Sequence, residues 1–173
     1  MDSTSHEGTK SATGEAMKNE ATKNEATKNE ATKNKVEKTY AGSCHCGAVQ
    51  FRVTADLAAG AGRCNCSICA KVAQTGGIVK PEAFQLVSRE EALSTYEWGG
   101  RTAKRFFCKT CGVHCFARGS LPELGGAYVS VNYNCLDGVE VGELKVVYWD
   151  GRHNNWHAGP RPKPWNILSG ASA

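Results

Sequence analysis

The spacing of the cysteines constrains this chain more than any other feature of its sequence. Nine cysteines occur in 173 residues, and most of them fall in three short clusters. The central cluster holds Cys64, Cys66 and Cys69, and the outer two read Cys44-His45-Cys46-Gly47 and Cys108-Lys109-Thr110-Cys111-Gly112. Thiols spaced this closely are typical either of metal sites or of redox and disulfide pairs.

The N-terminus favours a reducing compartment. It reads Met1-Asp2-Ser3-Thr4-Ser5-His6-Glu7, without the basic start and apolar run of a secretory signal. No stretch approaches the roughly 20 apolar residues that cross a bilayer. We therefore expect a cytoplasmic protein with no membrane partner. Disulfides do not persist there, so clustered cysteines would serve as metal ligands or redox sites.

The formal net charge of +4 does not indicate a nucleic-acid partner. Up to Lys38, seven lysines oppose seven acidic residues, so the excess belongs to the rest of the chain. If the clustered thiols bound two zinc ions as thiolates, the net charge of that part would fall to about +1. Electrostatics then gives little reason to expect nucleic acid as a partner. We expect a small-molecule substrate instead.

Composition divides the chain near residue 38. From Lys18 the pentad Lys-Asn-Glu-Ala-Thr runs three times without any large apolar residue, and its period matches neither a coiled coil nor a solenoid. We predict that residues 1–38 form a disordered, low-complexity tail, with an interaction arm as the alternative. Residues 39–173 would form one zinc-binding domain with its own core.

The sequence after residue 38 predicts a mainly β, mostly antiparallel fold with one or two brief helices. Val49, Phe51 and Val53 alternate with polar residues, the pattern of a half-buried strand. Asp137-Gly138 predicts a turn, and Ser88 with an acidic residue three positions on predicts a capped helical turn. Further strands are expected over 84–87, 95–98, 104–108, 113–117, 127–133 and 144–149.

The two outer clusters predict one zinc site between them. Each presents two thiols from a tight turn that is followed by Gly47 or Gly112. Glycine permits a positive φ there, which lets backbone N–H groups approach the sulfurs. Two such turns would close a tetrahedral four-cysteine site that fastens the N-terminal strand to the middle of the chain. A redox pair or buried structural cysteines are the alternatives, and four thiolates also suit iron.

The central cluster has an odd number of thiols. Cys64, Cys66 and Cys69 can reach one ion from a single loop, but they leave its fourth position without a local partner. Three protein ligands and an open position are the arrangement of a catalytic zinc, and three thiolates favour a soft fourth ligand such as a substrate thiolate. The alternative is a closed structural site, whose fourth ligand would be one of Cys115, Cys135, His45, His114, His153 or His157.

The order of the clusters resembles the glutathione-dependent formaldehyde-activating enzyme family, which also includes centromere protein V. The resemblance covers residues 40 to about 165. It rests on five segments and one tryptophan, namely Gly42–Val49, Cys64–Cys69, Phe107–Gly112, Asn134–Gly138, Tyr148–Arg152 and Trp156.

This resemblance implies an antiparallel β-tent of small sheets around two zinc sites. It implies a carbon–sulfur lyase that joins glutathione reversibly to formaldehyde, giving S-hydroxymethylglutathione. The structural zinc would be held by the outer thiols Cys44, Cys46, Cys108 and Cys111. The catalytic zinc would be held by Cys64, Cys66 and Cys69, and no catalytic side chain is assigned beyond these ligands.

The substrate is less constrained than the fold. Many family members carry an arginine directly after the third central cysteine, where this chain has Ala70 and then Lys71. Lysine does not replace arginine in bidentate pairing with a carboxylate. Candidates to bind the two carboxylates of glutathione are Lys71, Arg101, Arg105 and Arg152. Candidates for the acid that protonates the product are Asp137, Asp150, His153 and His157.

Two other functions stay open. One is a lyase or isomerase that uses the same zinc on a different, biosynthetic electrophile. An aromatic-lined pocket would favour it, with Tyr96, Trp98, Tyr128, Trp149 or Trp156 in its wall. The other is a non-catalytic, zinc-stabilised binding module.

Overall fold

The computed structural model describes residues 36–165 of the chain. The predicted tail falls almost wholly outside this range, and so do residues 166–173. Lys38, the last residue of the predicted tail, already belongs to the first strand. No helix in the described part is long and apolar enough to cross a membrane.

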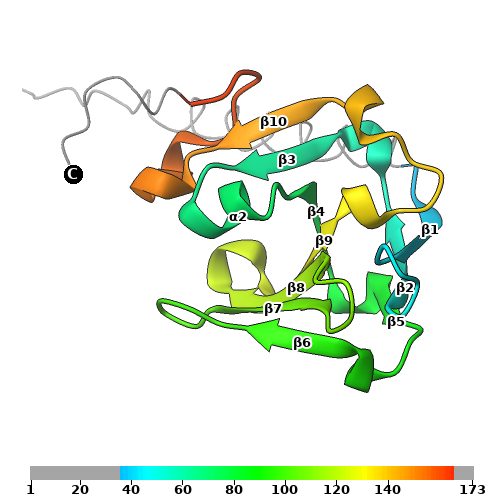
Figure 1. Ribbon diagram of the computed structural model, residues 1–173. Coiled ribbons are helices and arrows are strands. Elements are labelled where there is room, and N and C mark those ends of the chain that lie inside the picture. Colours follow the sequence, from blue (N-terminus) through cyan, green and yellow to red (C-terminus); the bar gives the residue numbers. More distant parts are fainter. Residues whose placement is uncertain (1–35, 166–173) are drawn as a thin grey trace, which may run out of the picture. The chain divides into compact units, whose positions relative to one another are not determined.

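Two β-sheets make up most of the described residues (Figure 1). The smaller sheet has the order β1 (Lys38–Ser43), β2 (Gln50–Ala55) and β5 (Phe84–Leu86). The larger sheet has seven strands. In spatial order they are β10 (Val146–Trp149), β3 (Ala61–Cys64), β4 (Thr75–Val79), β9 (Gly126–Asn132), β8 (His114–Leu121), β7 (Ala103–Cys108) and β6 (Leu93–Tyr96).

Helices are short throughout the described range. The α-helix α2 spans Ser67–Lys71. The other helical segments are single 3₁₀ turns at Leu57–Ala59, Pro81–Ala83, Glu90–Ala92, Pro122–Leu124, Tyr133–Cys135, Val141–Glu143, Gly151–His153 and Trp156–Ala158.

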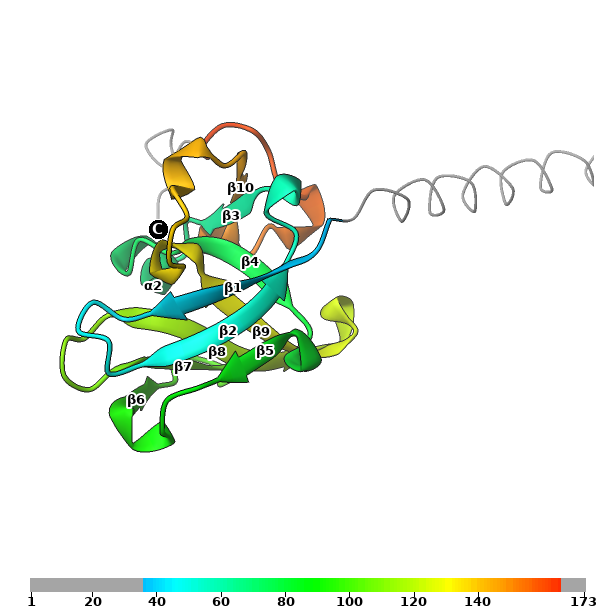
Figure 2. The same cartoon turned by 90° about the vertical axis from the view of Figure 1, so that its right-hand side faces the viewer.

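The larger sheet curves around α2. In Figure 1 its β10 and β3 end lies above α2, and its β7 and β6 end lies below. Figure 2 shows the smaller sheet lying across β8 and β9. The short helix that carries Cys69, with Cys66 at its N-cap, therefore lies between the two ends of one sheet.

A cluster of phenylalanines joins the two sheets. Phe51 and Phe116 are almost fully buried, and they come from β2 and β8. Phe84 on β5 lies between them, with ring centroids 5.4 Å from Phe51 and 4.7 Å from Phe116. Phe106 on β7 stacks on Phe116 at 4.8 Å. Aromatic pairs of this kind add about 0.5–1.5 kcal/mol each beyond the area they bury.

Most of the predicted strands are present. Phe51 and Val53 are buried, and Arg52 between them is exposed, as the alternation predicts. The strand predicted over 95–98 instead spans Leu93–Tyr96, and the one predicted over 144–149 begins only at Val146. The prediction omits β1, β3, β4 and α2. Two of these omissions have one cause, because the glycines of β3 and β4 disfavour strands by propensity.

Three further predictions need correction. β10 pairs with β3 in parallel over Val146–Trp149, although the other strand pairs of both sheets are antiparallel. The larger sheet has seven strands and is not small. The capping box is also wrong. The 3₁₀ turn starts after Arg89, and the buried hydroxyl of Ser88 has no hydrogen-bond partner.

Gly76 marks a close approach of β4 to β9. A Cβ atom at this position would overlap the carbonyl oxygen of Val131. Backbone cannot yield as a flexible side chain does, so we expect Gly76→Ala to destabilise the fold by about 2 kcal/mol or more. The measurement is the midpoint of urea unfolding of the metal-loaded protein.

Gly100→Ala is the matched control, because a Cβ there would meet only a Thr102 methyl group at 3.8 Å. This variant should unfold close to the wild-type midpoint. Equal midpoints for Gly76→Ala and the wild type would contradict the close packing of β4 on β9.

Candidate metal centre

Four of the predicted ligands meet where the two sheets join. Cys44 and Cys46 lie in the turn between β1 and β2, and Cys108 and Cys111 lie in the turn between β7 and β8. Their sulfur atoms all lie within 4.8 Å of one another. Cys46 Sγ is 3.6 Å from both Cys44 Sγ and Cys108 Sγ.

This geometry fits a tetrahedral metal ion. Zn–S bonds of about 2.3 Å place the sulfurs of a tetrahedron about 3.8 Å apart, close to the separations found here. All nine cysteines are free thiols. Gly47 and Gly112 have φ values of 75° and 74°, as the turn prediction requires.

Backbone N–H groups surround these sulfurs. Val49 N donates to Cys44 Sγ at 3.3 Å, and Thr110 N donates to Cys108 Sγ at 3.4 Å. Such hydrogen bonds favour the thiolate form that a metal requires. The backbone N–H of Val113 is the main cause that lowers the pKa of Cys111 to about 6.

The second cluster is built around the start of α2. Cys64 ends β3, Cys66 occupies the N-cap of α2, and Cys69 lies within the helix. Their three sulfurs lie within 4.8 Å of one another. Hydrogen bonds from the thiols of Cys64 and Cys69 lower the pKa of Cys66, so the metal-free cluster concentrates negative charge on one sulfur.

The three-thiol set has no fourth member in the described part of the chain, within the same 4.8 Å limit. The predicted candidates therefore do not close the site. Cys115 on β8 and Cys135 in the 3₁₀ turn after β9 are buried core thiols. His45 and His157 are exposed.

A buried clamp holds the three-thiol loop in place. Asn65, between two of the ligands, donates from Nδ2 to Asp150 Oδ1 at 2.7 Å and accepts at Oδ1 from Arg152 N at 2.8 Å. Asp150 is only 3% exposed. The hydrogen bonds from Asn65 and then His153 lower the pKa of this carboxyl group. The ligand loop is thus fixed to the segment that follows β10.

Asp150 also orients a histidine. His153 Nδ1 lies 2.9 Å from Asp150 Oδ1, and the imidazole is 41% exposed. Because Nδ1 faces the carboxylate, Nε2 is the nitrogen that can exchange a proton with a ligand or with water. Of the four predicted acids, Asp150 and His153 contact the ligand loop through Asn65, whereas Asp137 accepts from Ser43 in a turn.

A guanidinium lies against the same cluster. Arg105 Nη2 donates to Cys69 Sγ at 3.5 Å, and Nη1 donates to Gln74 Oε1 at 3.4 Å. Gln74 is buried and donates in turn to Ser130 Oγ at 2.8 Å. Arg105 was one of several predicted carboxylate partners. The structure places it at the sulfurs instead, and Lys71, Arg101 and Arg152 are exposed.

His114 is a buried histidine without a partner. It is 8% exposed, and neither ring nitrogen has a hydrogen-bond partner. Burial, and then the nearby charge of Arg105, lower its pKa to about 4. The ring is therefore neutral at pH 7, with one N–H donor and one bare nitrogen acceptor. An unpaired buried group costs about 1–3 kcal/mol.

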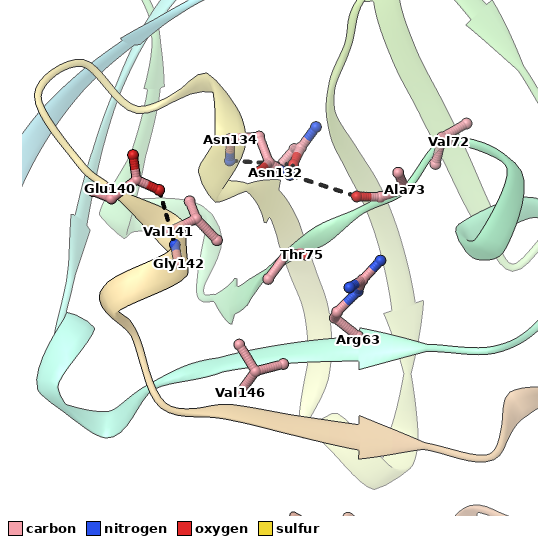
Figure 3. Close-up of a pocket in the computed structure, with 10 residues that line it drawn as sticks. All are labelled: Arg63, Val72, Ala73, Thr75, Asn132, Asn134, Glu140, Val141, Gly142 and Val146. Carbon is pink, nitrogen blue, oxygen red and sulfur yellow. Dashed lines mark hydrogen bonds between the residues drawn. The ribbon is translucent and has the colours of Figure 1, made fainter. Parts of the chain in front are cut away.

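Two cavities flank the C-terminal end of α2, and Val72 lines both. The smaller, of about 320 Å³, contains Arg105 and His114 in its wall. The larger, of about 550 Å³, is shown in Figure 3. Arg63 projects into it from β3, beneath the side chains of Asn132 and Asn134.

Sequence reasoning missed most of these surroundings. Asn65 and Arg63 flank Cys64 in the printed sequence, but their contacts lie on segments that are remote along the chain. Asn65 reaches Asp150, and Arg105 reaches Cys69, across long sequence separations. The position of Asn65 between two ligands was the one available signal.

The fold and the sites define a class, namely a mainly β protein with one four-thiol and one three-thiol group, each able to hold a metal ion. Comparison with known proteins narrows this class. The family described as glutathione-dependent formaldehyde-activating enzyme matches residues 39–150. The chain belongs to this family.

Individual relatives agree. A Halomonas elongata protein named "Putative glutathione-dependent formaldehyde-activating enzyme" is 44% identical over 78 residues, covering 40% of this chain and 50% of the relative. The chain thus spans about half the length of this curated relative. A crystal structure of a Rhodobacter sphaeroides protein is similar with a TM-score of 0.51 and 35% identity, covering 58% of this chain and 90% of that one.

The Asn65 clamp should govern metal retention at the three-thiol site. We expect Asn65→Ala to weaken metal binding there by about 10- to 100-fold, the usual effect of losing a residue that orients the ligands. The four-thiol site should be unaffected. Competition with a chromophoric chelator measures both affinities.

Ser67→Ala is the control, since Ser67 lies in the same loop and is exposed. It should retain metal as the wild type does. If Asn65→Ala kept both affinities, the clamp would have no role in holding the metal.

Proposed function

We propose that this chain is a zinc-dependent carbon–sulfur lyase. It joins glutathione, or a related thiol, reversibly to formaldehyde or another small electrophile. Cys44, Cys46, Cys108 and Cys111 hold a structural zinc in this proposal, and Cys64, Cys66 and Cys69 hold a catalytic one.

One observation carries the proposal. Three thiols within 4.8 Å of one another form a group with no fourth His, Cys, Asp or Glu partner among residues 36–165. A separate four-thiol group in the same fold offers the four ligands that a structural ion requires. An incomplete ligand set, near two cavities and a partly buried arginine, is the arrangement of a site that accepts a substrate atom.

A zinc ion held by three thiolates would supply one property, a lowered pKa for a thiol bound at its fourth position. Arg105 would neutralise the negative charge of this site. Three thiolates and Zn²⁺ sum to about −1, and the guanidinium 3.5 Å from Cys69 Sγ offsets this charge. Arg105 would therefore ease the approach of a fourth anionic sulfur, that of the substrate.

The Asp150–His153 pair supplies a route for the proton. The thiol loses a proton before its sulfur attacks the carbonyl carbon, and the oxygen of the adduct gains one. His153, held at Nδ1 by Asp150, has Nε2 free to accept the first proton and donate the second. The overall reaction neither consumes nor releases a proton.

The larger cavity suits the thiol substrate. Glutathione carries polar groups along its length, and Arg63, Thr75 and Asn134 line this space beside Glu140 and several apolar residues. The guanidinium of Arg63 can pair with one carboxylate in bidentate geometry. Its volume of about 550 Å³ lies within the range of drug-sized ligand sites.

Exchange spectroscopy by NMR tests the function directly. The zinc-loaded wild type should accelerate the exchange between free glutathione with formaldehyde and S-hydroxymethylglutathione. Cys66→Ser should return the rate to the uncatalysed value because the ligand set is broken. His153→Gln should slow the catalysed exchange by about 100-fold, as the loss of a general acid–base group does.

Cys135→Ala is the matched control, since it removes a thiol outside both clusters and should leave the rate close to wild type. No acceleration by the wild type would refute the reaction with formaldehyde and favour another electrophile or a zinc-stabilised binding module. Full activity in Cys66→Ser would show that the three-thiol group is not the reaction site.

A further inference from the structure

The smaller cavity lies next to the three-thiol group, and the proposed binding of glutathione does not occupy it. Ile68 in its wall precedes Cys69, and Arg105 both lines the cavity and donates to Cys69 Sγ at 3.5 Å. A molecule held here would lie next to Arg105 and to the helix that carries Cys69.

The cavity is far too large for formaldehyde. Its volume is about 320 Å³, whereas formaldehyde is scarcely larger than a water molecule, which takes up about 30 Å³ in the liquid. Most of its wall is apolar, with Ile68 and Val72 from α2, Phe107 from β7 and the ring of Tyr96 from β6. Water would gain few hydrogen bonds from such a wall, so an apolar group fits better.

Two polar residues of the wall, Arg105 and His114, differ in the hydrogen bonds that they already make. Arg105 already donates to Cys69 and Gln74. His114 has two unpaired ring nitrogens although it is more than nine-tenths buried. The ring is neutral, so it suits an uncharged oxygen rather than a carboxylate. The site therefore combines a largely apolar surface with a buried neutral histidine that has no hydrogen-bond partner.

We propose that this cavity binds the electrophile, and that its preferred electrophile is an aldehyde with an apolar side chain, whose carbonyl oxygen accepts a hydrogen bond from His114. This inference rests on the proposed lyase function and names the substrate class of the same site. The side chain of the aldehyde lies against Ile68, Val72, Tyr96 and Phe107.

The step balances without another reactant. The substrate sulfur forms a bond to the carbonyl carbon, and the π electron pair of the C=O bond moves to oxygen. That oxygen takes up the proton that the thiol released, and the product is a hemithioacetal. His114 donates a hydrogen bond to the oxygen throughout and keeps its own proton.

The binding test uses an unreactive probe, so it does not depend on catalysis. Isoamyl alcohol has the branched chain of isovaleraldehyde and a hydroxyl group in place of the carbonyl. Added to the metal-loaded full-length chain, it should shift the ring-nitrogen NMR signals of His114, which are assigned by their loss in His114→Gln. Unshifted His114 signals at millimolar alcohol would overturn the proposal, whether or not the lyase function holds.

The activity test compares isovaleraldehyde with formaldehyde by the exchange assay, using glutathione as the thiol. The wild type should have the higher kcat/KM for isovaleraldehyde. Thr95→Trp places an indole in the cavity from an exposed position on β6, and it should lower the ratio of the two kcat/KM values by about 10-fold or more. Glu97→Trp adds the same group just beyond β6, outside the cavity, and should keep the wild-type ratio.

The two proposals fail in different ways. A wild type that accelerates neither aldehyde refutes the lyase function. A wild type that prefers formaldehyde, or a ratio in Thr95→Trp equal to that of the wild type, refutes the aldehyde preference and leaves the lyase function standing.

Discussion

The contact between two turns, one from each sheet, is the constraint on which the rest of this fold depends. Cys44 and Cys46 follow β1 of the smaller sheet, and Cys108 and Cys111 lie at and just after the end of β7 in the larger sheet. The four sulfur atoms lie within 4.8 Å of one another. Structural zinc binding contributes about 10–16 kcal/mol in zinc-finger peptides, against about 0.5–1.5 kcal/mol for each aromatic pair between the sheets. A metal here would dominate the attachment of one sheet to the other.

The two thiol groups can therefore have different roles, one in stabilising the fold and the other in catalysis. Because the four-thiol group can hold the sheets together, the three-thiol group need not be closed. Its ligands lie at the end of β3 and on α2, inside the curve of the larger sheet. Asn65 fixes the loop through Asp150, while Arg105 offsets its charge from β7. Groups that are not themselves predicted ligands thus position the three-thiol loop.

The sequence predicts the local part of this arrangement well. Short spacing brings Cys64, Cys66 and Cys69 together whatever the fold, and glycines after Cys46 and Cys111 form the turns. The long-range part could not be predicted. Nothing in the sequence near Arg105 indicates that its guanidinium reaches Cys69. Gly76 lies in a strand although glycine disfavours strands by propensity. A side chain would not fit at this position, because the backbone of Val131 approaches too closely.

Our proposal requires that one of two bound zinc ions has an open position. X-ray absorption on the zinc-loaded protein measures the average number of sulfur ligands per zinc ion, and the zinc content is determined on the same sample. We expect two zinc ions per chain with about 3.5 sulfur ligands each on average, rising to about 4 when glutathione is added. A value of 4 before glutathione is added, or a single zinc per chain, would contradict the account.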